Sequence, residues 1–494
     1  MNTLGIDIGS SSIKVTLFDV ENGKSIGNAS FPPKEMDIIS LRQDWAEQDP
    51  EVWMNNLQKA IESLRKEHQS ALPDVAAIGI SYQMHGLVMV DHKGQVLRNS
   101  IIWCDSRAVN IGNKAFIDLG CGFCLQHLLN SPGNFTASKL KWVKENEHLT
   151  FDKLHKFMLP GDYVAFRLTN EIKTTASGLS EGILWDFERN TVSDELLQYY
   201  GFNREMIPDI VDTFSIQGHL SNEMAEILGL TAGIPVTYRS GDQPNNALSL
   251  KVLNPGEVAA TAGTSGVVYG VTESKAYDQQ SRVNTFLHVN NSENNPRLGV
   301  LLCLNSVGIL NSWVRHQLLG SEISYNEMNL LASNIEEGSN GLMILPFGNG
   351  SERVLENKHI GASMHGLNLT QHHKGHIVRA LQEGIAFAFK YGLEIMQPLG
   401  LDLRVIRAGK ANMFLSPVFA STLSNLSGAR IELYNTDGAE GAARGAAIGA
   451  GFYTKPEEAF DGLRLLESFE SEPNSRINDY YEIWKKFLEK ELQS

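Results

Sequence analysis

The sequence predicts an α/β protein built as two halves around a central cleft. Its 494 residues exceed what one hydrophobic core usually supports, so at least two domains are expected. Short apolar strand patterns alternate with helical patterns in both halves. Each half also opens in the same way, with strand, small-residue turn, strand, turn and strand. A cleft between duplicated halves is a natural place for a ligand.

The N-terminal half begins with a predicted β-meander. Strands are expected over residues 3–9, 13–19 and 25–31, and the first turn is Ser10-Ser11-Ser12. The small residues of that turn suit a tight reversal of the chain.

A helix is predicted to follow the meander. Asp49 has the side chain of an N-cap, Pro50 suits the first helical position, and apolar residues then recur at helical spacing. A buried strand is expected at 75–81. Residues 110–230 read as a helix-rich insertion with a polar, hairpin-like piece near 171–188.

The second half repeats the opening pattern. Strands are expected at 258–262, 267–271 and 299–304, with the turn Gly263-Thr264-Ser265-Gly266 after the first. Further expected elements are the long helix 376–399, the strands 403–408 and 430–434, and the helix 440–453, whose Ala and Gly content permits close backbone approach.

Composition excludes several classes of function. The net charge of −15 makes nucleic acid and anionic membranes unsuitable partners. No apolar run is long enough to cross a bilayer, and the chain enters a strand directly after Met1-Asn2, so a cytoplasmic location is expected. A homodimer is left open.

Two groups of residues resemble metal or redox sites only superficially. Cys121 and Cys124 have the spacing of a redox or zinc motif, but no second pair accompanies them, which favours ordinary thiols. His372, His373 and His376 lack an accompanying glutamate and are interpreted as a solvated first helical turn rather than a metal site.

One carboxylate stands at a strand-to-helix turn near the middle of the chain. The apolar strand 234–238 leads to Gly241 and Asp242, and a helix can start at Asn245. A carboxylate held there is rigidly placed and can serve as a general base. The alternative is that Asp242 only caps the helix.

The two small-residue turns are candidate phosphate sites. Backbone N–H groups and hydroxyls of residues 9–12 and 263–266 are free of bulky side chains, a combination that holds phosphate oxygens. Asp7 ends the strand before the first turn and could hold Mg²⁺ through water, because Mg²⁺ keeps much of its hydration. A single such turn would be weak evidence, since tight hairpins need small residues anyway.

Polar side chains between two buried strands suggest recognition of a polyol. Gln83 and His85 both donate and accept hydrogen bonds, and Met84 lies between them. Trp103 and Asp105 could add an apolar face and an acceptor. The alternative is a turn whose polar groups are satisfied within the protein.

The chain resembles the FGGY family of carbohydrate kinases. The matching motifs run in family order from residue 3 to about 450 and are specific. They are Gly5–Ser11, Trp45–Pro50, Gly79–Gly86, Ile102–Arg107, Phe135–Leu140, Leu159–Tyr163, Gly241–Gln243, Gly263–Gly266, Gly350–Arg353 and Glu440–Ala443.

The resemblance implies an actin-like, ribonuclease-H-like fold in both halves, with ATP and a sugar in the cleft. It implies a sugar-binding domain over 1–247 and a nucleotide-binding domain over 248–494. Asp242 would be the general base and Asp7 would position Mg²⁺. The implied sugar contacts are Gln83, Met84, His85, Trp103, Asp105, Asp242 and Gln243, and the implied ATP contacts are Ser10, Ser11, Ser12, Lys14, Gly263, Thr264, Ser265, Gly409 and Asn412.

Within the family, the Gln-Met-His-Gly segment at 83–86 favours a ketopentose, D-xylulose first, phosphorylated at its terminal hydroxyl. Ribulose, fuculose, rhamnulose and glycerol remain alternatives. An actin- or chaperone-like ATPase is disfavoured because it needs no polyol site. A sugar-responsive regulator is disfavoured by the acidity and by the lack of a basic helix-turn-helix segment.

Overall fold

The computed structural model describes residues 1–493, which form two compact units. Unit 1 comprises Met1–Lys251, Phe286–Leu298 and Thr436–Leu463, and unit 2 comprises the remaining described residues. The second half of the chain therefore contributes a helix to the first unit. The functional division at 247/248 stays a prediction.

Unit 1 is built on a six-stranded sheet in the order β13-β14-β5-β1-β2-β3. The predicted meander is present as β1 (Asn2–Ile8), β2 (Ile13–Asp19) and β3 (Lys24–Phe31), paired antiparallel. β5 (Val75–Tyr82) runs parallel to β1, and β14 (Pro235–Gly241) runs parallel to β5. The carboxyl ends of these three parallel strands thus meet at one edge of the sheet.

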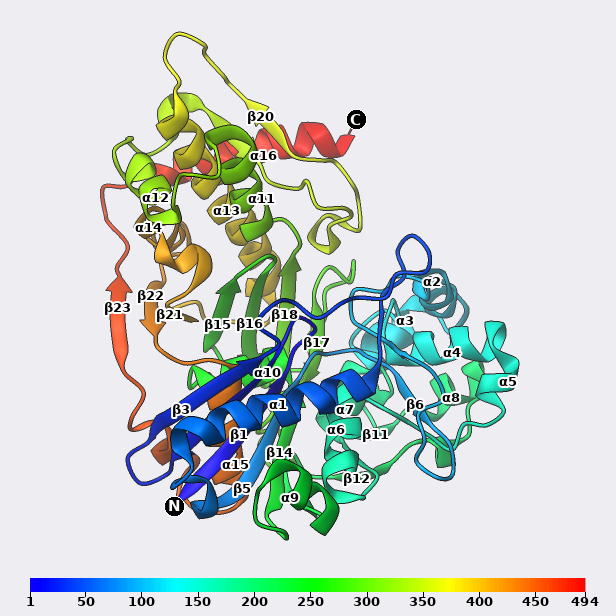
Figure 1. Cartoon of the computed structure of the whole chain (residues 1–494). Helices are drawn as coiled ribbons and strands as arrows, with labels where there is room; N and C mark the ends of the chain where they lie inside the picture. Colours follow the sequence, from blue (N-terminus) through cyan, green and yellow to red (C-terminus); the bar gives the residue numbers. More distant parts are fainter. Residues whose placement is uncertain (494) are drawn as a thin grey trace. The chain divides into compact units, whose positions relative to one another are not determined.

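Two helices cover opposite faces of this sheet (Figure 1). The predicted α1 (Pro50–His68) starts at the Asp49 cap and packs its apolar side against Leu4, Ile6 and other large residues. The other face carries small residues and receives α15 (Gly438–Gly449). Because side chains alternate along a strand, Asp7 shares the α15 face with Gly5.

α15 lies unusually close to the strands, as its Ala and Gly content predicted. A Cβ atom added at Gly5 or Gly79 would come within 3.0 Å of the α15 backbone. The Thr3 hydroxyl also donates to the Ala443 carbonyl at 2.9 Å, and the Thr237 hydroxyl to the Ala446 carbonyl at 2.8 Å. The helix is held by backbone proximity rather than by large side chains.

Unit 2 repeats the strand order in a seven-stranded sheet, β17-β18-β16-β15-β21-β22-β23. β15 (Val258–Ala262) pairs antiparallel with β16 (Gly266–Thr272) and parallel with β21 (Val405–Gly409), which is parallel to β22 (Arg430–Tyr434). Five strands of each sheet thus follow one order, β3-β2-β1-β5-β14 in unit 1 and β18-β16-β15-β21-β22 in unit 2. This confirms the α/β class and the actin-like, ribonuclease-H-like fold.

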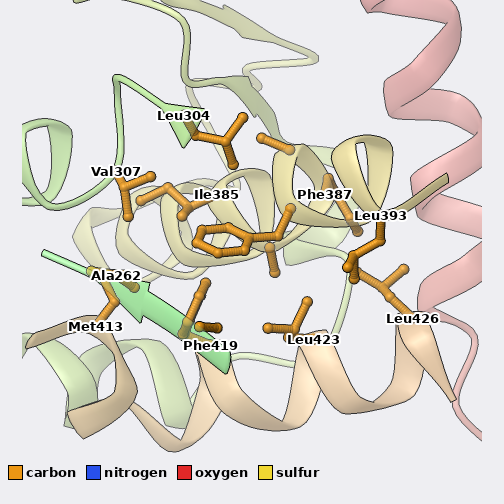
Figure 2. Packing of buried hydrophobic residues seen from close by; sticks show 14 of the residues in the cluster. Ala262, Leu304, Val307, Ile385, Phe387, Leu393, Met413, Phe419, Leu423 and Leu426 are labelled. Atoms are coloured by element: carbon orange, nitrogen blue, oxygen red, sulfur yellow. The ribbon is translucent and has the colours of Figure 1, made fainter. Parts of the chain in front are cut away.

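The core of unit 2 lies between its sheet and two long helices (Figure 2). Ile385 and Phe387 of α13 (Lys374–Met396) are buried together with Phe419 and Leu423 of α14 (Pro417–Ser427). Phe389 and Phe419 meet edge to face at 5.5 Å, a favoured geometry for aromatic rings.

One predicted element is wrong. The segment near 171–188 is not a hairpin, because Ala176–Glu181 forms the helix α7, capped by the Thr175 hydroxyl. Its short, mixed sequence carries no helical period, and tertiary contacts decide its conformation.

The remaining elements of the first half are β4 (Glu47–Gln48), β6 (Val88–Val90), β7 (Ser100–Ile101), α2 (Val109–Asp118), α3 (Cys121–Phe123), α4 (Thr136–Asn146), α5 (His148–Phe151), β8 (Lys156–Met158), α6 (Pro160–Thr169), β9 (Lys173–Thr175), β10 (Trp185–Asp186), β11 (Thr191–Val192), α8 (Asp194–Tyr200), β12 (Asp209–Val211), β13 (Phe214–His219), α9 (Asn222–Leu228) and α10 (Asp242–Ser249). Those of the second half are β17 (Asn284–Leu287), β18 (Leu298–Leu304), α11 (Gly308–Trp313), α12 (Tyr325–Ser333), β19 (Met343–Leu345), β20 (Ser363–His365), β23 (Leu465–Phe469) and α16 (Ile477–Gln493).

Over residues 1–493, none of the helices combines the length and the apolar character needed to cross a lipid bilayer. All four cysteines are free thiols. Neither Cys121 and Cys124 nor the three histidines at 372–376 belong to a metal-binding cluster in the described part of the chain.

The close approach of α15 gives a test of the fold. Gly79→Ala should destabilise the protein by roughly 3 kcal/mol, because the added methyl meets the Ala442 carbonyl and the backbone cannot yield cheaply. Gly122→Ala is the matched control, since nothing lies within 4 Å of its added methyl. Urea unfolding of both variants measures the difference, and equal stabilities would contradict the packing described.

Candidate active site

Asp242 lies where β14 ends and α10 begins. Gly241, not Asp242, is the N-cap residue of α10, and Asp242 is the first helical residue. The interpretation of Asp242 as a mere cap is therefore wrong.

The surroundings of Asp242 suit a general base. Burial and, to a lesser extent, the neighbouring Asp7 carboxylate raise its pKa to about 7, while Gln243 acts in the opposite direction. A carboxyl group whose pKa lies near neutral pH is matched to accepting a proton in the cell.

Asp7 lies at the end of β1 on the same face of the sheet. It pairs across the strands with Lys14 on one side and Ser81 on the other. Burial raises the pKa of Asp7 and Lys14 opposes that shift, whereas Asp437 adds to it. A Cβ atom at Gly438 would lie 2.6 Å from the Asp7 carboxylate, so the glycine leaves that carboxylate its space at the start of α15.

The turn after Asp7 is held by its own backbone. The Gly9 amide donates to the Ser12 carbonyl at 3.1 Å, which closes the turn between β1 and β2. Trp103 donates from its indole nitrogen to the Ser10 hydroxyl at 3.3 Å. Ser11 is exposed, so the turn presents hydroxyl groups to solvent beside Asp7.

Gln83 is connected to that turn through Gln48. The Gln83 amide donates to Gln48 Oε1 at 3.2 Å, and the Gln48 amide donates to the Ser10 carbonyl at 2.7 Å. Gln83 is 3% exposed and its own side-chain oxygen has no hydrogen-bond partner among the described residues. That oxygen is a buried acceptor available to a ligand hydroxyl.

His85 is fixed in both backbone and ring. Its φ of 62° is left-handed, and its carbonyl accepts from Lys139 Nζ at 2.9 Å. The Lys139 ammonium is fully buried and also donates to the Ile102 carbonyl at 2.9 Å. His85 Nδ1 lies 2.9 Å from the Glu181 carbonyl, which can only accept, so the proton is on Nδ1.

Met84 lies beside the end of β14, and so does Glu181, a residue that the sequence did not single out. A Cβ atom at Gly241 would lie within 3.0 Å of both the Met84 side chain and the Glu181 carboxyl group. The two side chains therefore close around the glycine that precedes Asp242. The structure thus brings the 83–85 segment and Asp242 together within unit 1.

Asp105 has a different role from the one expected. It is fully buried, and its oxygens accept from the Ala46 amide at 2.6 Å and from the Arg107 guanidinium at 2.6 Å and 2.9 Å. Arg107 in turn contacts Glu47 at 2.7 Å and stacks on Trp45 at 3.8 Å. Because both oxygens of Asp105 have protein partners, it supports the loop rather than offering an acceptor. Trp103, two residues earlier, is 46% exposed.

Unit 2 brings the second small-residue turn and the 409–412 segment together. A Cβ atom at Gly263 would lie 3.6 Å from Asn412 Nδ2. The Gly263 carbonyl accepts from the Gly308 amide at 2.8 Å, while Thr264 is exposed and Ser265 half-buried. Gly409 ends β21, and Asn412 has a left-handed φ of 54°. These residues form one local surface of backbone amides and small side chains.

Four residues of the site were missed. Gln48 and Lys139 lie in the motifs at 45–50 and 135–140, so their signal was present but no chemistry was attached to it. Asp437 accepts from the Glu440 amide as the cap of α15, and the Asp-x-x-Glu spacing could have found it. Glu181 lies in the segment for which a hairpin was expected, and nothing in its neighbours along the chain indicates its burial.

Comparison with known proteins agrees with these observations. The model of the N-terminal domain of the FGGY family of carbohydrate kinases matches residues 2–249, and that of the C-terminal domain matches residues 258–453. A xylulose kinase of Bacillus subtilis (strain 168) is 30% identical over 464 residues, which is 92% of this chain and 89% of that protein. One of Escherichia coli (strain K12) is 28% identical, covering 92% and 91%. A crystal structure from Brucella ovis, described as a "xyloylose kinase", superposes with a TM-score of 0.89 at 26% identity, covering 99% of both chains.

The raised pKa of Asp242 predicts how stability depends on pH. The folded protein holds this proton until about pH 7, whereas the unfolded chain releases it near the ordinary value of 3.8, so stability is lost progressively as the pH rises between those values. Asp242→Asn should remove that loss. Its gain in the free energy of unfolding over the wild type should be larger at pH 8 than at pH 4 by roughly 2–4 kcal/mol, at about 1.4 kcal/mol per pKa unit. Unfolding curves recorded at several pH values measure this difference, and Asp209→Asn, at an exposed position, is the control. A gain in stability that does not vary with pH would refute the prediction.

Proposed function

The chain belongs to the FGGY family of carbohydrate kinases, and from this premise we propose that it transfers the γ-phosphate of ATP to the terminal hydroxyl of D-xylulose. The observation that carries the proposal is Asp242, a carboxyl group with a pKa of about 7 that is not used as a helix cap and adjoins the 83–85 segment. The similarity to proteins described as xylulose kinases supports the choice of sugar.

In the proposed reaction Asp242 accepts the proton of the terminal hydroxyl as that oxygen attacks phosphorus. Gln83 offers its unpaired oxygen to a sugar hydroxyl. His85, whose Nδ1 is held at the Glu181 carbonyl, is a second proposed sugar contact. Met84 and Trp103 supply apolar surface, and Gln243 moderates the charge of Asp242. Asp105 acts through Arg107 and the loop that carries Trp103.

Phosphoryl transfer is largely a matter of positioning and charge stabilisation. Asp7 is a carboxylate beside a turn of hydroxyls, so its donor set fits a hydrated Mg²⁺ ion, which would neutralise phosphate charge. Ser10, Ser11, Ser12 and Lys14 would hold phosphate oxygens on unit 1. On unit 2 the corresponding proposed contacts are Gly263, Thr264, Ser265, Gly409 and Asn412.

The proposal assigns sugar binding to residues 1–247 and nucleotide binding to residues 248–494. It also places the enzyme in the cytoplasm, where ATP and free sugars meet. A homodimer is compatible with this activity and is not required by it.

A panel of acceptors tests the substrate. We expect kcat/KM to be highest for D-xylulose among D-xylulose, L-xylulose, D- and L-ribulose, D-fructose and glycerol, measured by ADP release. A wrong epimer leaves a buried polar group unpaired, which costs ~1–3 kcal/mol, or about tenfold in discrimination. Another preferred acceptor would overturn only the choice of sugar. ADP release that no acceptor stimulates would overturn the kinase proposal.

Asp242→Asn should lower kcat for D-xylulose by ~10²–10⁴ while sugar binding, measured by calorimetry, persists. The carboxamide keeps the shape of the side chain and cannot accept the proton. Asn246→Asp, on the same helix, is the matched control and should retain far more activity. Near-normal turnover of the Asn variant would remove Asp242 from the mechanism.

Asp7→Ala should reduce kcat at least about tenfold and raise the Mg²⁺ concentration needed for half-maximal rate, because a carboxylate that orders the hydrated ion is gone. Sugar affinity without nucleotide should change far less. Asp19→Asn, at the opposite end of the β1–β2 pair, is the control. If the Mg²⁺ dependence of the Ala variant is normal, Asp7 is structural only.

A further inference from the structure

The Glu181 carboxyl group has the properties of a ligand contact that neither the sequence nor the family motifs indicated. Glu181 is 2% exposed, and its Oε1 atom is buried without a hydrogen-bond partner among residues 1–493. Buried polar atoms in folded proteins nearly always have partners. The Glu181 carboxyl group lies beside Gly241 and Met84, with Oε2 as the oxygen nearest the glycine. The unpaired Oε1 of this group therefore needs an explanation.

The charged groups around Glu181 do not explain the unpaired Oε1 atom. Burial raises its pKa well above the usual value, and the negative charges of Asp242 and Asp162 raise it further, whereas the Tyr82 hydroxyl opposes that shift. The nearby Arg239 guanidinium is committed to Asp162 at 3.0 Å. Glu181 also ends helix α7, where the helix dipole disfavours a negative charge. The charged form of the group is thus disfavoured, and in its neutral form the group can donate a hydrogen bond as well as accept one.

The helix that carries Glu181 is rigidly supported. The Ser177 hydroxyl donates to the Leu287 carbonyl at 2.9 Å, and the Leu287 amide donates to the Ser180 hydroxyl at 3.0 Å. The Glu181 carbonyl also holds the His85 ring, as described above. A residue anchored in this way is placed precisely against the 83–85 segment.

We propose that the Glu181 carboxyl group is a specificity-determining contact, which hydrogen-bonds one hydroxyl of the acceptor sugar beside Met84 and Asp242. The inference rests on the proposed function, since it concerns the same site. The sugar supplies the partner that Oε1 lacks, and an acceptor without that hydroxyl leaves the carboxyl group unpaired.

Glu181→Met separates this role from a structural one. Methionine has similar length and no hydrogen-bonding group, so it removes the unpaired buried oxygen. We expect the sugar-free variant to melt at a higher temperature than the wild type and its KM for D-xylulose to rise about tenfold, with a smaller effect on kcat. A purely structural Glu181 predicts a lower melting temperature, and a variant that fails to fold would likewise show that Glu181 is structural.

Deoxy analogues of D-xylulose identify the contact. For the analogue that lacks the contacted hydroxyl, wild type and Glu181→Met should have equal kcat/KM, whereas the other analogues keep the tenfold difference. Glu181→Gln keeps a donor and an acceptor and should restore activity to within about threefold of the wild type. Ser177→Ala disturbs α7 without altering the carboxyl group and should change all acceptors by one factor.

The outcomes are distinguishable. If Glu181→Met lowers kcat/KM by the same factor on every analogue, or leaves all of them unchanged, the inference is overturned while the proposed function stands. If the wild-type enzyme phosphorylates none of the sugars, the proposed function fails, and the role of Glu181 fails with it.

Discussion

The close packing of α15 on the small-residue face of the first sheet is the constraint on which the candidate site depends. Gly5 and Gly79 let the helix backbone approach β1 and β5 more closely than any side chain would allow. That approach brings Gly438, at the start of α15, against the Asp7 carboxylate. A segment far along the chain thus completes the surroundings of a residue near its start, because the helix needs the strands to bury its apolar side.

Three acidic side chains belong to the candidate site of this unit. Asp7, Asp242 and Glu181 each have a raised pKa, with burial the largest cause in all three. Such a cluster reduces the stability of the empty protein and supplies groups of different character. The pKa of Asp242 lies near neutral pH, which suits this group to exchange a proton, and the pKa of Glu181 is raised well above its usual value. Pairs of acids with separated pKa values are the usual way in which a site divides its tasks.

Much of the fold and part of the candidate site could be predicted from the sequence, for physical reasons. The meander, α1 and the strand before Asp242 were predictable because hydrophobic period, capping residues and turn residues act locally. Position at a strand end sufficed to single out Asp7 and Asp242. The close approach of α15 also followed from its composition.

What could not be predicted depends on contacts between distant segments. Asp105 looks like a free acceptor in sequence, and only the fold shows Arg107 and the Ala46 amide occupying it. Glu181 lies in a segment whose sequence indicates a polar hairpin, and only the fold buries it beside Gly241. In both cases the number of partners decides the role of the carboxyl group. A carboxylate with all its hydrogen bonds made supports the protein, whereas a buried oxygen without a partner costs stability that a ligand can recover.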